Sequence, residues 1–210
     1  MSVLQKIAFY QNRRDEVPNQ ELARELAMTG DTAGIQEIAD NLWNKNKNVH
    51  SDCLKVLYEI GYLRPELIAA YAEDFIKLLS SKNNRMVWGA MIGLSTVAGL
   101  RADAVWEHKA EIMRVIDNGS VITVVNGVKV LAGAAAANAE YCAGLMPFLL
   151  KQMQGCIPRD VPVHAESILP AVDAGNKDAV LAVINARMAE FSPAQLTRVR
   201  RVVKRMAEIA

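Results

Sequence analysis

The chain has 210 residues, of which 51% are hydrophobic and 22% charged, the composition of an ordinary folded protein. Its 24 basic and 23 acidic residues give a net charge of +1, which excludes a global electrostatic attraction to nucleic acid or to an anionic membrane. No apolar run approaches the ~18 residues that span a bilayer, and the N-terminus shows no signal-peptide pattern, so we expect no membrane partner and no secretion.

The first part of the chain is predicted to form three short helices. Val3 to Arg14 carries a helical stripe of apolar residues and ends near Pro18, which disfavours helix in the residue before it. Asn19 to Met28 follows, and the glycine of Thr29-Gly30-Asp31 supplies its C-terminal stop. The aspartate of the same turn is a candidate N-cap for a third helix, Thr32 to Trp43.

The central stretch Arg85 to Ile116 reads as two amphipathic helices separated by a break at Gly99 to Ala102. Neither helix buries its apolar face alone. Shifting the stretch by about 37 residues places apolar residues on apolar residues, which indicates a tandem repeat. Four columns of apolar residues keep this period: Ile38, Phe75, Ile112 and Leu149; Leu42, Leu79, Ile116 and Met153; Leu57, Leu94, Leu131 and Ile168; and Ile60, Val97, Ala134 and Ala171.

The repeat divides the chain into pairs of antiparallel helices, and we expect one all-α domain over residues 1–210. The pairs cover approximately residues 1–29, 31–61, 65–99, 103–137, 139–173 and 176–209. Short polar breaks at Asn44 to Asn48, Lys82 to Asn84 and Asp117 to Ser120 supply turns. Ser192-Pro193-Ala194-Gln195 is a capping box, which predicts the start of a last helix that runs to about Glu208.

One segment carries a signal for a different structure. Ser120 to Val130 is rich in β-branched residues and contains Asn126-Gly127, the strongest local signal for a β-hairpin. An isolated hairpin among helices is marginal in water, whereas Val124, Val128 and Leu131 keep the helical phase and fall on the repeat. We therefore predict a helix for this segment.

Helix pairs of this length, with a short polar turn after the opening helix and small residues in the closing helix, resemble the HEAT-like repeats of the armadillo-type α-solenoids. The resemblance extends from about Asp31 to Phe191. Leu145-Met146-Pro147-Phe148-Leu149-Leu150 resembles that family's opening helix with its characteristic proline, but Glu73 and Ala110 stand at the equivalent positions of other pairs. The aspartate and arginine usual around the turn within a pair are not in place. The resemblance implies a right-handed α-solenoid and leaves the subfamily open.

The sequence contains no recognisable reaction centre. It has no phosphate-binding loop, no dinucleotide fingerprint, and no HExxH or GxSxG motif. His50 and Cys53 stand one helical turn apart, but no second pair of ligands lies near them in sequence, so we expect no metal and no cofactor. Three cysteines outside any CxxC pattern favour a reducing, cytoplasmic location. We expect a protein that is not an enzyme.

In an α-solenoid of this kind the closing helices line the concave surface, so their positions outside the core are candidates for contact with a partner. Read by the repeat period, these positions predict a partner surface formed by Asp52, Lys55, Trp88, Asn126 and Lys129. Trp88 follows an apolar column by one residue, so it is either half-buried packing or an exposed aromatic anchor for binding. The surface is mixed in charge and has no continuous basic stripe.

The last helix is strongly basic. Five cations fall within two turns, and only Glu208 opposes them: Arg198, Arg200, Arg201, Lys204 and Arg205. Cations near a helix C-terminus are favourable, and a polar outer face keeps the end of a repeat array soluble, so we interpret this helix as a solvated cap. The alternative is an anion-binding surface formed by Arg198, Arg201 and Arg205.

Two functions fit these features. The first is a non-catalytic interaction or scaffold module that binds a protein or peptide on its concave face. The second is a nucleic-acid-binding protein that resembles the HEAT-like DNA glycosylases acting on alkylated bases, for which Trp88 and Asp52 would supply an aromatic and an acidic residue. The basic residues concentrate at the C-terminus rather than along the closing helices, so we favour the first function.

Overall fold

The computed structural model describes residues 2–209, which form helices and loops with no strand in that range. The all-α prediction is therefore confirmed for the described residues. The chain divides into two compact units, Met1–Arg101 (unit 1) and Ala102–Ala210 (unit 2), and each is described by itself. The expectation of one continuous domain stays a prediction. None of the helices described is long and apolar enough to cross a bilayer.

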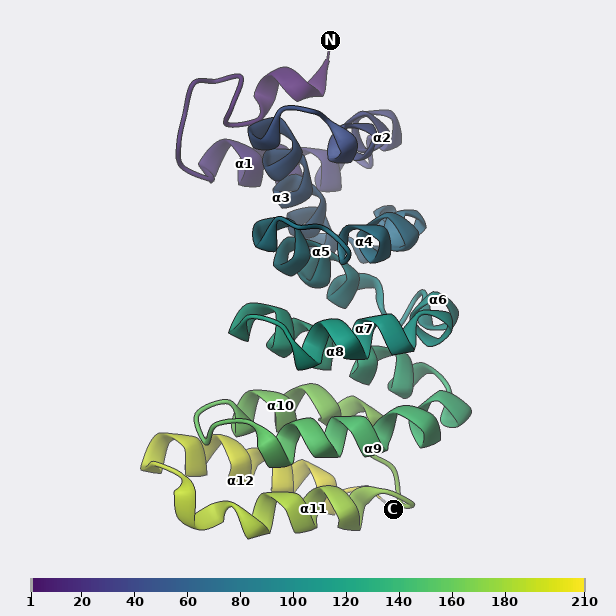
Figure 1. The fold of residues 1–210 in the computed structure, drawn as a ribbon, viewed down its shortest axis with the longest axis vertical. Helices are drawn as coiled ribbons and strands as arrows, with labels where there is room; N and C mark the ends of the chain where they lie inside the picture. The colour runs from purple at the N-terminus through teal and green to yellow at the C-terminus, as the bar shows by residue number, and fades with distance from the viewer. Residues whose placement is uncertain (1, 210) are drawn as a thin grey trace. The chain divides into compact units, whose positions relative to one another are not determined.

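Unit 1 places its longest helix, α3, between α1 and α5, while the shorter α2 and α4 pack against α3 and α5 respectively (Figure 1). The opening helix and the closing helix of each pair thus form two layers with the apolar columns between them. The elements of unit 1, in chain order, are the 3-10 helix η1 (Val3–Lys6), α1 (Val17–Thr29), α2 (Thr32–Asp40), η2 (Asn41–Trp43), α3 (Lys47–Leu63), η3 (Pro65–Leu67), η4 (Ala69–Tyr71), α4 (Ala72–Leu78) and α5 (Asn84–Val97).

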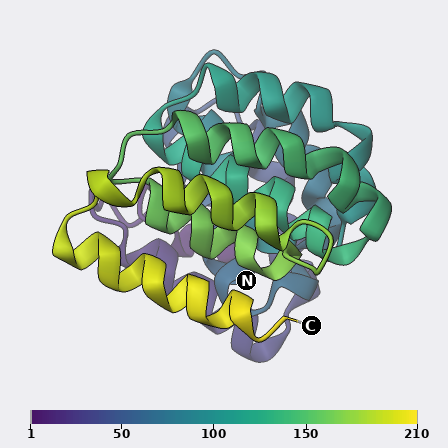
Figure 2. The same ribbon diagram turned by 90° about the horizontal axis from the view of Figure 1, so that it is seen from below.

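Unit 2 repeats this arrangement. Its helix α8 packs against α7, α9 and α10, and α12 packs against α10 and α11. Figure 2 shows α11 and α12 side by side at the edge of this unit. The elements of unit 2 are α6 (Ala102–Glu107), α7 (Lys109–Asp117), α8 (Val121–Ala137), α9 (Ala139–Gly155), α10 (Val161–Ile168), η5 (Leu169–Ala171), α11 (Lys177–Ala186), η6 (Met188–Glu190) and α12 (Pro193–Ala207).

The four predicted apolar columns form the core. Every residue in them is 5% exposed or less, and most are completely buried. Fully burying one leucine or isoleucine side chain stabilises a fold by about 1.5–3 kcal/mol, so the columns are the main source of stability within each unit. The positions that recur with the repeat period in the sequence are thus the positions that the fold buries.

Arginine side chains link successive helix pairs within each unit. In unit 1 the guanidinium of Arg64 donates to the carbonyl of Ala27, at 3.4 Å, in the last turn of α1. In unit 2 that of Arg187 donates to the carbonyls of Met153 (3.0 Å) and Cys156 (2.6 Å) at the end of α9. The last carbonyls of a helix have no partner inside the helix, so a cation from the next pair satisfies them.

The segment with the hairpin signal is helical, as predicted from the repeat. Residues 121–137 form α8, whose side chains Thr123, Val128 and Leu131 are completely buried. The helix begins at the N-cap Ser120, whose hydroxyl oxygen accepts from the amide of Thr123. Burial of one helical face therefore outweighs the β-branched propensity of the segment. The predicted capping box of Ser192 and Gln195 is also confirmed, at the start of α12.

Two sequence predictions are wrong in detail. The helix expected over Val3 to Arg14 is only the short η1, because the amides that follow bond to side chains instead: Ala8 N donates to Asn19 Oδ1 (2.9 Å) and Phe9 N to Asp52 Oδ2 (2.8 Å). The helix expected after the Gly99 to Ala102 break is interrupted at His108, which leaves helical geometry with φ −96° and ψ 12°.

Candidate protein-interaction surface

One face of α3 and α5 in unit 1 carries a group of charged and aromatic side chains. We call Glu16, Lys55, Tyr58, Arg85 and Trp88 the surface cluster. Lys55 Nζ lies 2.8 Å from a carboxylate oxygen of Glu16, and an Arg85 nitrogen lies 3.6 Å from the other oxygen. Glu16 precedes α1, so its carboxylate ties the N-terminal segment to both closing helices.

Lys55 is the buried centre of the surface cluster, since only 8% of it is exposed. Its ammonium lies 2.7 Å from Glu59 as well as beside Glu16, and stands 4.8 Å above the ring of Tyr58. Burial alone would lower the pKa of Lys55, but the hydrogen bonds to Glu16 and Glu59 outweigh burial and raise this pKa above its usual value. Lys55 is therefore a charged, internally paired residue rather than a free contact for a partner.

Trp88 lies half-buried on α5, in a shallow depression that it lines with Lys55, Tyr58 and Arg85. The two helices approach closely beside it, because a Cβ on Gly89 would lie 2.7 Å from a methyl carbon of Leu54. The backbone that carries Trp88 is therefore closely packed against α3, while the Trp88 residue itself is only half-buried. A partly exposed tryptophan on a closely packed helix has the properties of a binding anchor.

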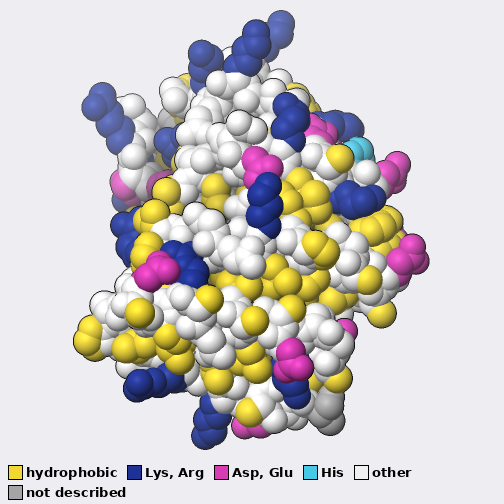
Figure 3. All heavy atoms as spheres, turned by 60° about the horizontal axis from the view of Figure 1, so that its bottom comes forward, with side chains coloured by type: hydrophobic (Ala, Val, Ile, Leu, Met, Phe, Trp, Pro, Cys, Tyr) yellow, Lys and Arg dark blue, Asp and Glu magenta, His cyan; other side chains and the backbone are white. Residues whose placement is uncertain are grey.

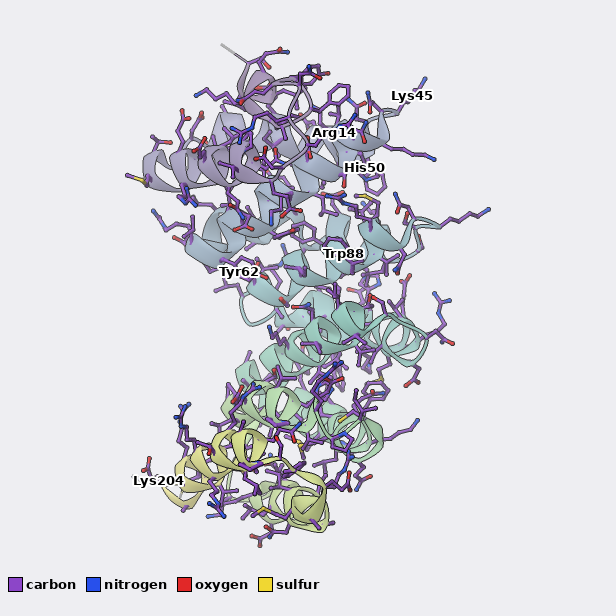
Figure 4. The ribbon with its side chains drawn as sticks, turned by 90° about the vertical axis from the view of Figure 1, so that its left-hand side faces the viewer. Arg14, Lys45, His50, Tyr62, Trp88 and Lys204 are labelled. Atoms are coloured by element: carbon purple, nitrogen blue, oxygen red, sulfur yellow. The ribbon has the colours of Figure 1, made fainter. Side chains whose placement is uncertain are left out.

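A polar pocket adjoins the surface cluster. It has a volume of about 540 Å³ and lies between the N-terminal loop and the first turns of α3 and α5. We call it the N-terminal pocket. It is lined by Ala8, Phe9, Asn12, Arg13, Arg14, Asp15, Glu16, Lys47, Asn48, Ser51, Asp52, Asn83 and Arg85. In Figure 4 Arg14 stands above Trp88 on the same side of unit 1, with Tyr62 farther along α3.

Asp52 was predicted to face a partner, but its carboxylate accepts hydrogen bonds from other residues of the chain. Its two carboxylate oxygens accept from Phe9 N at 2.8 Å and from Asn19 Nδ2 at 2.9 Å. Asp52 thus fixes the N-terminal loop, and its contact with a partner stays a prediction. The repeat period placed Asp52 on the right helix, but the loop that covers it arrives from 43 residues away.

The two predicted residues of unit 2 differ from each other. Asn126 is 7% exposed, and its amide donates to the carbonyl of Ile122 at 2.8 Å inside α8. Asn126 therefore offers no side chain to a partner, which corrects that prediction. Lys129 is exposed on the same helix, and Val121 and Ile122 are 54% and 47% exposed in its first turn.

The basic helix α12 buries Val199, Val202 and Met206 and directs its cations outward. Arg198 is partly neutralised, since its Nε lies 2.9 Å from the carboxylate of Glu166 on α10. The remaining cations are exposed: Arg200, Arg201, Lys204 and Arg205. The arrangement satisfies both interpretations of the sequence, a solvated cap and a local anion-binding surface.

Solved structures with this arrangement of helices share the fold over nearly the whole chain. A designed armadillo repeat protein in complex with the peptide (KR)4 matches with a TM-score of 0.67 and 15% identity, covering 97% of this chain and 98% of that chain. The chain has the armadillo/HEAT-like solenoid fold. An engineered protein matches with a TM-score of 0.66 and 16% identity over 99% of this chain and 98% of that one.

Kap121p also has this fold, with a TM-score of 0.66 and 15% identity; the match covers 99% of this chain and 23% of Kap121p. No protein-family profile matches the sequence, and a search of curated protein sequences finds no match. At this level of identity the solenoid match concerns the fold alone.

Unit 2 also contains a surface groove, which was not predicted from the sequence. A groove of about 550 Å³ runs along α9 and α11, with a floor of alanine and aliphatic side chains. Its lining is Leu150, Gln154, Ala179, Ala182, Val183, Ala186, Arg187 and Glu190. On the face that Figure 3 shows, hydrophobic side chains form several patches with charged side chains between them. The small residues Ala179, Ala182 and Ala186 recur at helical spacing, a signal that was available in the sequence.

The cysteine and histidine side chains of the described residues do not come together to form a metal site. Among residues 2–209 no group of three or more His, Cys, Asp or Glu side chains is placed to hold a metal ion. Cys53 is completely buried, and burial raises the pKa of its thiol to about 12, so it is not a reactive thiolate. His50 Nε2 and His164 Nδ1 are buried and make no hydrogen bond within the described residues.

Proposed function

We propose that this protein is a non-catalytic interaction module, or scaffold, that binds a protein or peptide on the concave face formed by its closing helices. The observation that carries the proposal is Trp88, half-buried beside the ion-paired Lys55 and Arg85 on the face of α3 and α5. Binding energy in protein interfaces concentrates on tryptophan, tyrosine and arginine held in rigid surroundings. The surface cluster contains all three residue types.

Three potentially reactive side chains of α3 favour this function over catalysis. Asp52 is satisfied by backbone and amide donors, Lys55 is ion-paired, and the thiol of Cys53 is buried. A reaction centre needs at least one such group free and poised toward a substrate. We propose further that the protein acts in the cytoplasm, where its three cysteines, which form no disulfide, remain reduced.

The nucleic-acid alternative lacks its acidic residue, because Asp52 is committed to the N-terminal loop. Its other support is the exposed cations of α12. Replacing Arg198, Arg201 and Arg205 with Gln tests it directly. As a solvated cap, α12 tolerates the three changes with little loss of stability, because exposed ion pairs contribute roughly 0–1 kcal/mol each. Tight duplex binding that survives physiological salt and disappears in the triple variant would favour the alternative.

The proposal is tested with immobilised protein and a cell lysate, followed by binding measurements with the purified partner. Trp88→Ala is compared with Trp43→Ala, a matched control because Trp43 is 53% exposed on η2, outside the surface cluster. We expect Trp88→Ala to weaken binding about 30-fold, the effect of losing an interface hot spot of about 2 kcal/mol, and Trp43→Ala to leave it unchanged. Equal effects of the two changes, or recovery of nucleic acid alone, would refute the proposal.

A further inference from the structure

We propose that the N-terminal pocket of unit 1 binds an acidic segment of the partner polypeptide, whose carboxylates pair with Arg14 and Lys47. This inference rests on the proposed interaction function and specifies the chemistry of the partner. The pocket and the surface cluster share Arg85 and Glu16, and Ser51 lines both the pocket and the depression at Trp88. A bound peptide would therefore extend from the tryptophan into the polar pocket.

The carboxylates of the pocket are already used by the protein. Asp15 accepts from the guanidinium of Arg13 at 2.8 Å, a bond that holds the pKa of Asp15 below its usual value. Glu16 is paired with Lys55, and Asp52 accepts from two nitrogens of the N-terminal segment. Cations thus neutralise Asp15 and Glu16, whereas Asp52 keeps its charge and has both oxygens bound to neutral donors.

Two of the cations, in contrast, are free. Arg14 and Lys47 are exposed, and neither forms an ion pair with any residue in the described range 2–209. Arg85 has only the long 3.6 Å contact with Glu16. The charge that the pocket presents to a ligand is therefore positive, although the formal charges of its lining nearly balance.

Lys47 and Arg85 occupy positions in their helices that are electrostatically unfavourable for a cation. They are the first residue of α3 and the second residue of α5, and neither first turn contains an acidic residue. The helix dipole disfavours cations at an N-terminus and favours anions there. The N-termini of α3 and α5 thus add to the positive potential of the pocket. An anionic side chain of a ligand would reduce the repulsion between these helix ends and the two cations.

The loop that carries Arg14 is held in one conformation. Asn12 adopts a left-handed backbone, with φ 53°, and its amide donates to the carbonyl of Phe9 at 3.1 Å. Arg13 N donates to the carbonyl of Ala8 at 2.9 Å, and its side chain is fixed by Asp15. A binding site that is ordered before the ligand arrives loses less conformational entropy on binding.

A polypeptide fits this pocket better than a nucleic acid. A phosphate backbone carries one charge per nucleotide and needs a continuous track of cations, whereas the pocket offers two cations without an ion pair in the described residues. An acidic peptide needs only one or two carboxylates, which can pair with Arg14 and Lys47.

The experiment measures binding of three fluorescein-labelled probes to the full chain by anisotropy: a hexaglutamate peptide, a hexalysine peptide and a single-stranded hexanucleotide. The test variant is Arg14→Gln with Lys47→Gln. The matched control, Arg24→Gln with Lys151→Gln, removes the same charge from exposed positions of α1 and α9, outside the pocket and outside the basic helix α12. Circular dichroism verifies that both variants remain folded.

We expect the acidic peptide to bind at low salt, to dissociate as salt rises, and to bind the test variant about two- to tenfold more weakly, since each exposed ion pair changes an affinity up to about fivefold. The control variant should bind like the parent. The inference fails if the acidic peptide does not bind at low salt, if the control loses as much affinity as the test variant, or if the hexanucleotide binds more tightly. If it fails while Trp88→Ala still releases the captured partner, the interaction function stands without this pocket.

Discussion

Substitution of Gly93 by alanine tests how closely α4 and α5 pack in unit 1. Gly93 faces Phe75, which is completely buried, and a Cβ on Gly93 would lie 2.8 and 2.9 Å from two carbons of that ring. Ordinary carbon contacts are about 3.5–4.0 Å, so the ring or the helix must move by more than half an ångström. Phe75 stands in one of the repeat columns and is completely buried, so its ring can move only by displacing its neighbours in the core.

Two opposing effects set the magnitude. Alanine in a helix interior is about 1 kcal/mol more favourable than glycine, while overpacking a dense core costs about 1–3 kcal/mol. The net expectation for Gly93→Ala is a loss of up to about 2 kcal/mol. Gly155→Ala is the control, because Gly155 ends α9 and a Cβ added to it would meet no atom within 4 Å, so the change should gain a few tenths of a kcal/mol.

Urea unfolding followed by far-UV circular dichroism measures both variants. The midpoint should fall for Gly93→Ala and rise slightly for Gly155→Ala. If Gly93→Ala is as stable as Gly155→Ala, the close approach of α4 and α5 at Phe75 does not exist as described.

Three further changes probe other parts of the structure. Leu94→Ala should lower the free energy of unfolding by about 2–5 kcal/mol, because Leu94 is completely buried, and an unchanged urea midpoint would show that the repeat register is wrong. Arg187→Gln should cost about 1–3 kcal/mol and speed amide exchange at the end of α9, since it removes a charged donor from the carbonyls there; unaltered exchange would contradict that role. Burial lowers the pKa of His164 below 6.5 despite the nearby Asp160, so the unfolded chain binds this proton first and stability falls as the pH drops through 6.5. His164→Leu should flatten the decline of the urea midpoint between about pH 7.5 and 5.5, and a parent midpoint constant over that range would exclude the effect.

The core of this protein could be read from the sequence because a solenoid is close to one-dimensional. Each helix pair buries the same positions, so the period alone identified Phe75, Leu94 and Leu131 as core residues and kept Val121 to Val130 helical despite its hairpin signal. These predictions need only local periodicity and the next repeat.

The candidate site was harder to predict, because it depends on parts of the chain that do not repeat. Asp52 and Lys55 lie on the expected helix, yet both are bound by the N-terminal loop, whose path no period encodes. Asn126 shows a second limit, since the period identifies it as a position outside the apolar columns but does not reveal that its side chain is buried and bonded to Ile122 within α8. The N-terminal pocket joins Arg14 to Lys47 across 33 residues through that same loop, so the sequence held no sign of it.

Hydrogen–deuterium exchange of the full chain, with and without the partner recovered through the Trp88 surface, tests the central claim most directly. The partner should slow exchange in the N-terminal loop around Arg14, in the first half of α3 (Lys47–Leu63) and in α5 (Asn84–Val97). Protection confined to the basic helix α12 or to the groove of α9 and α11, with α3 and α5 unchanged, would contradict the assignment of this face as the binding surface.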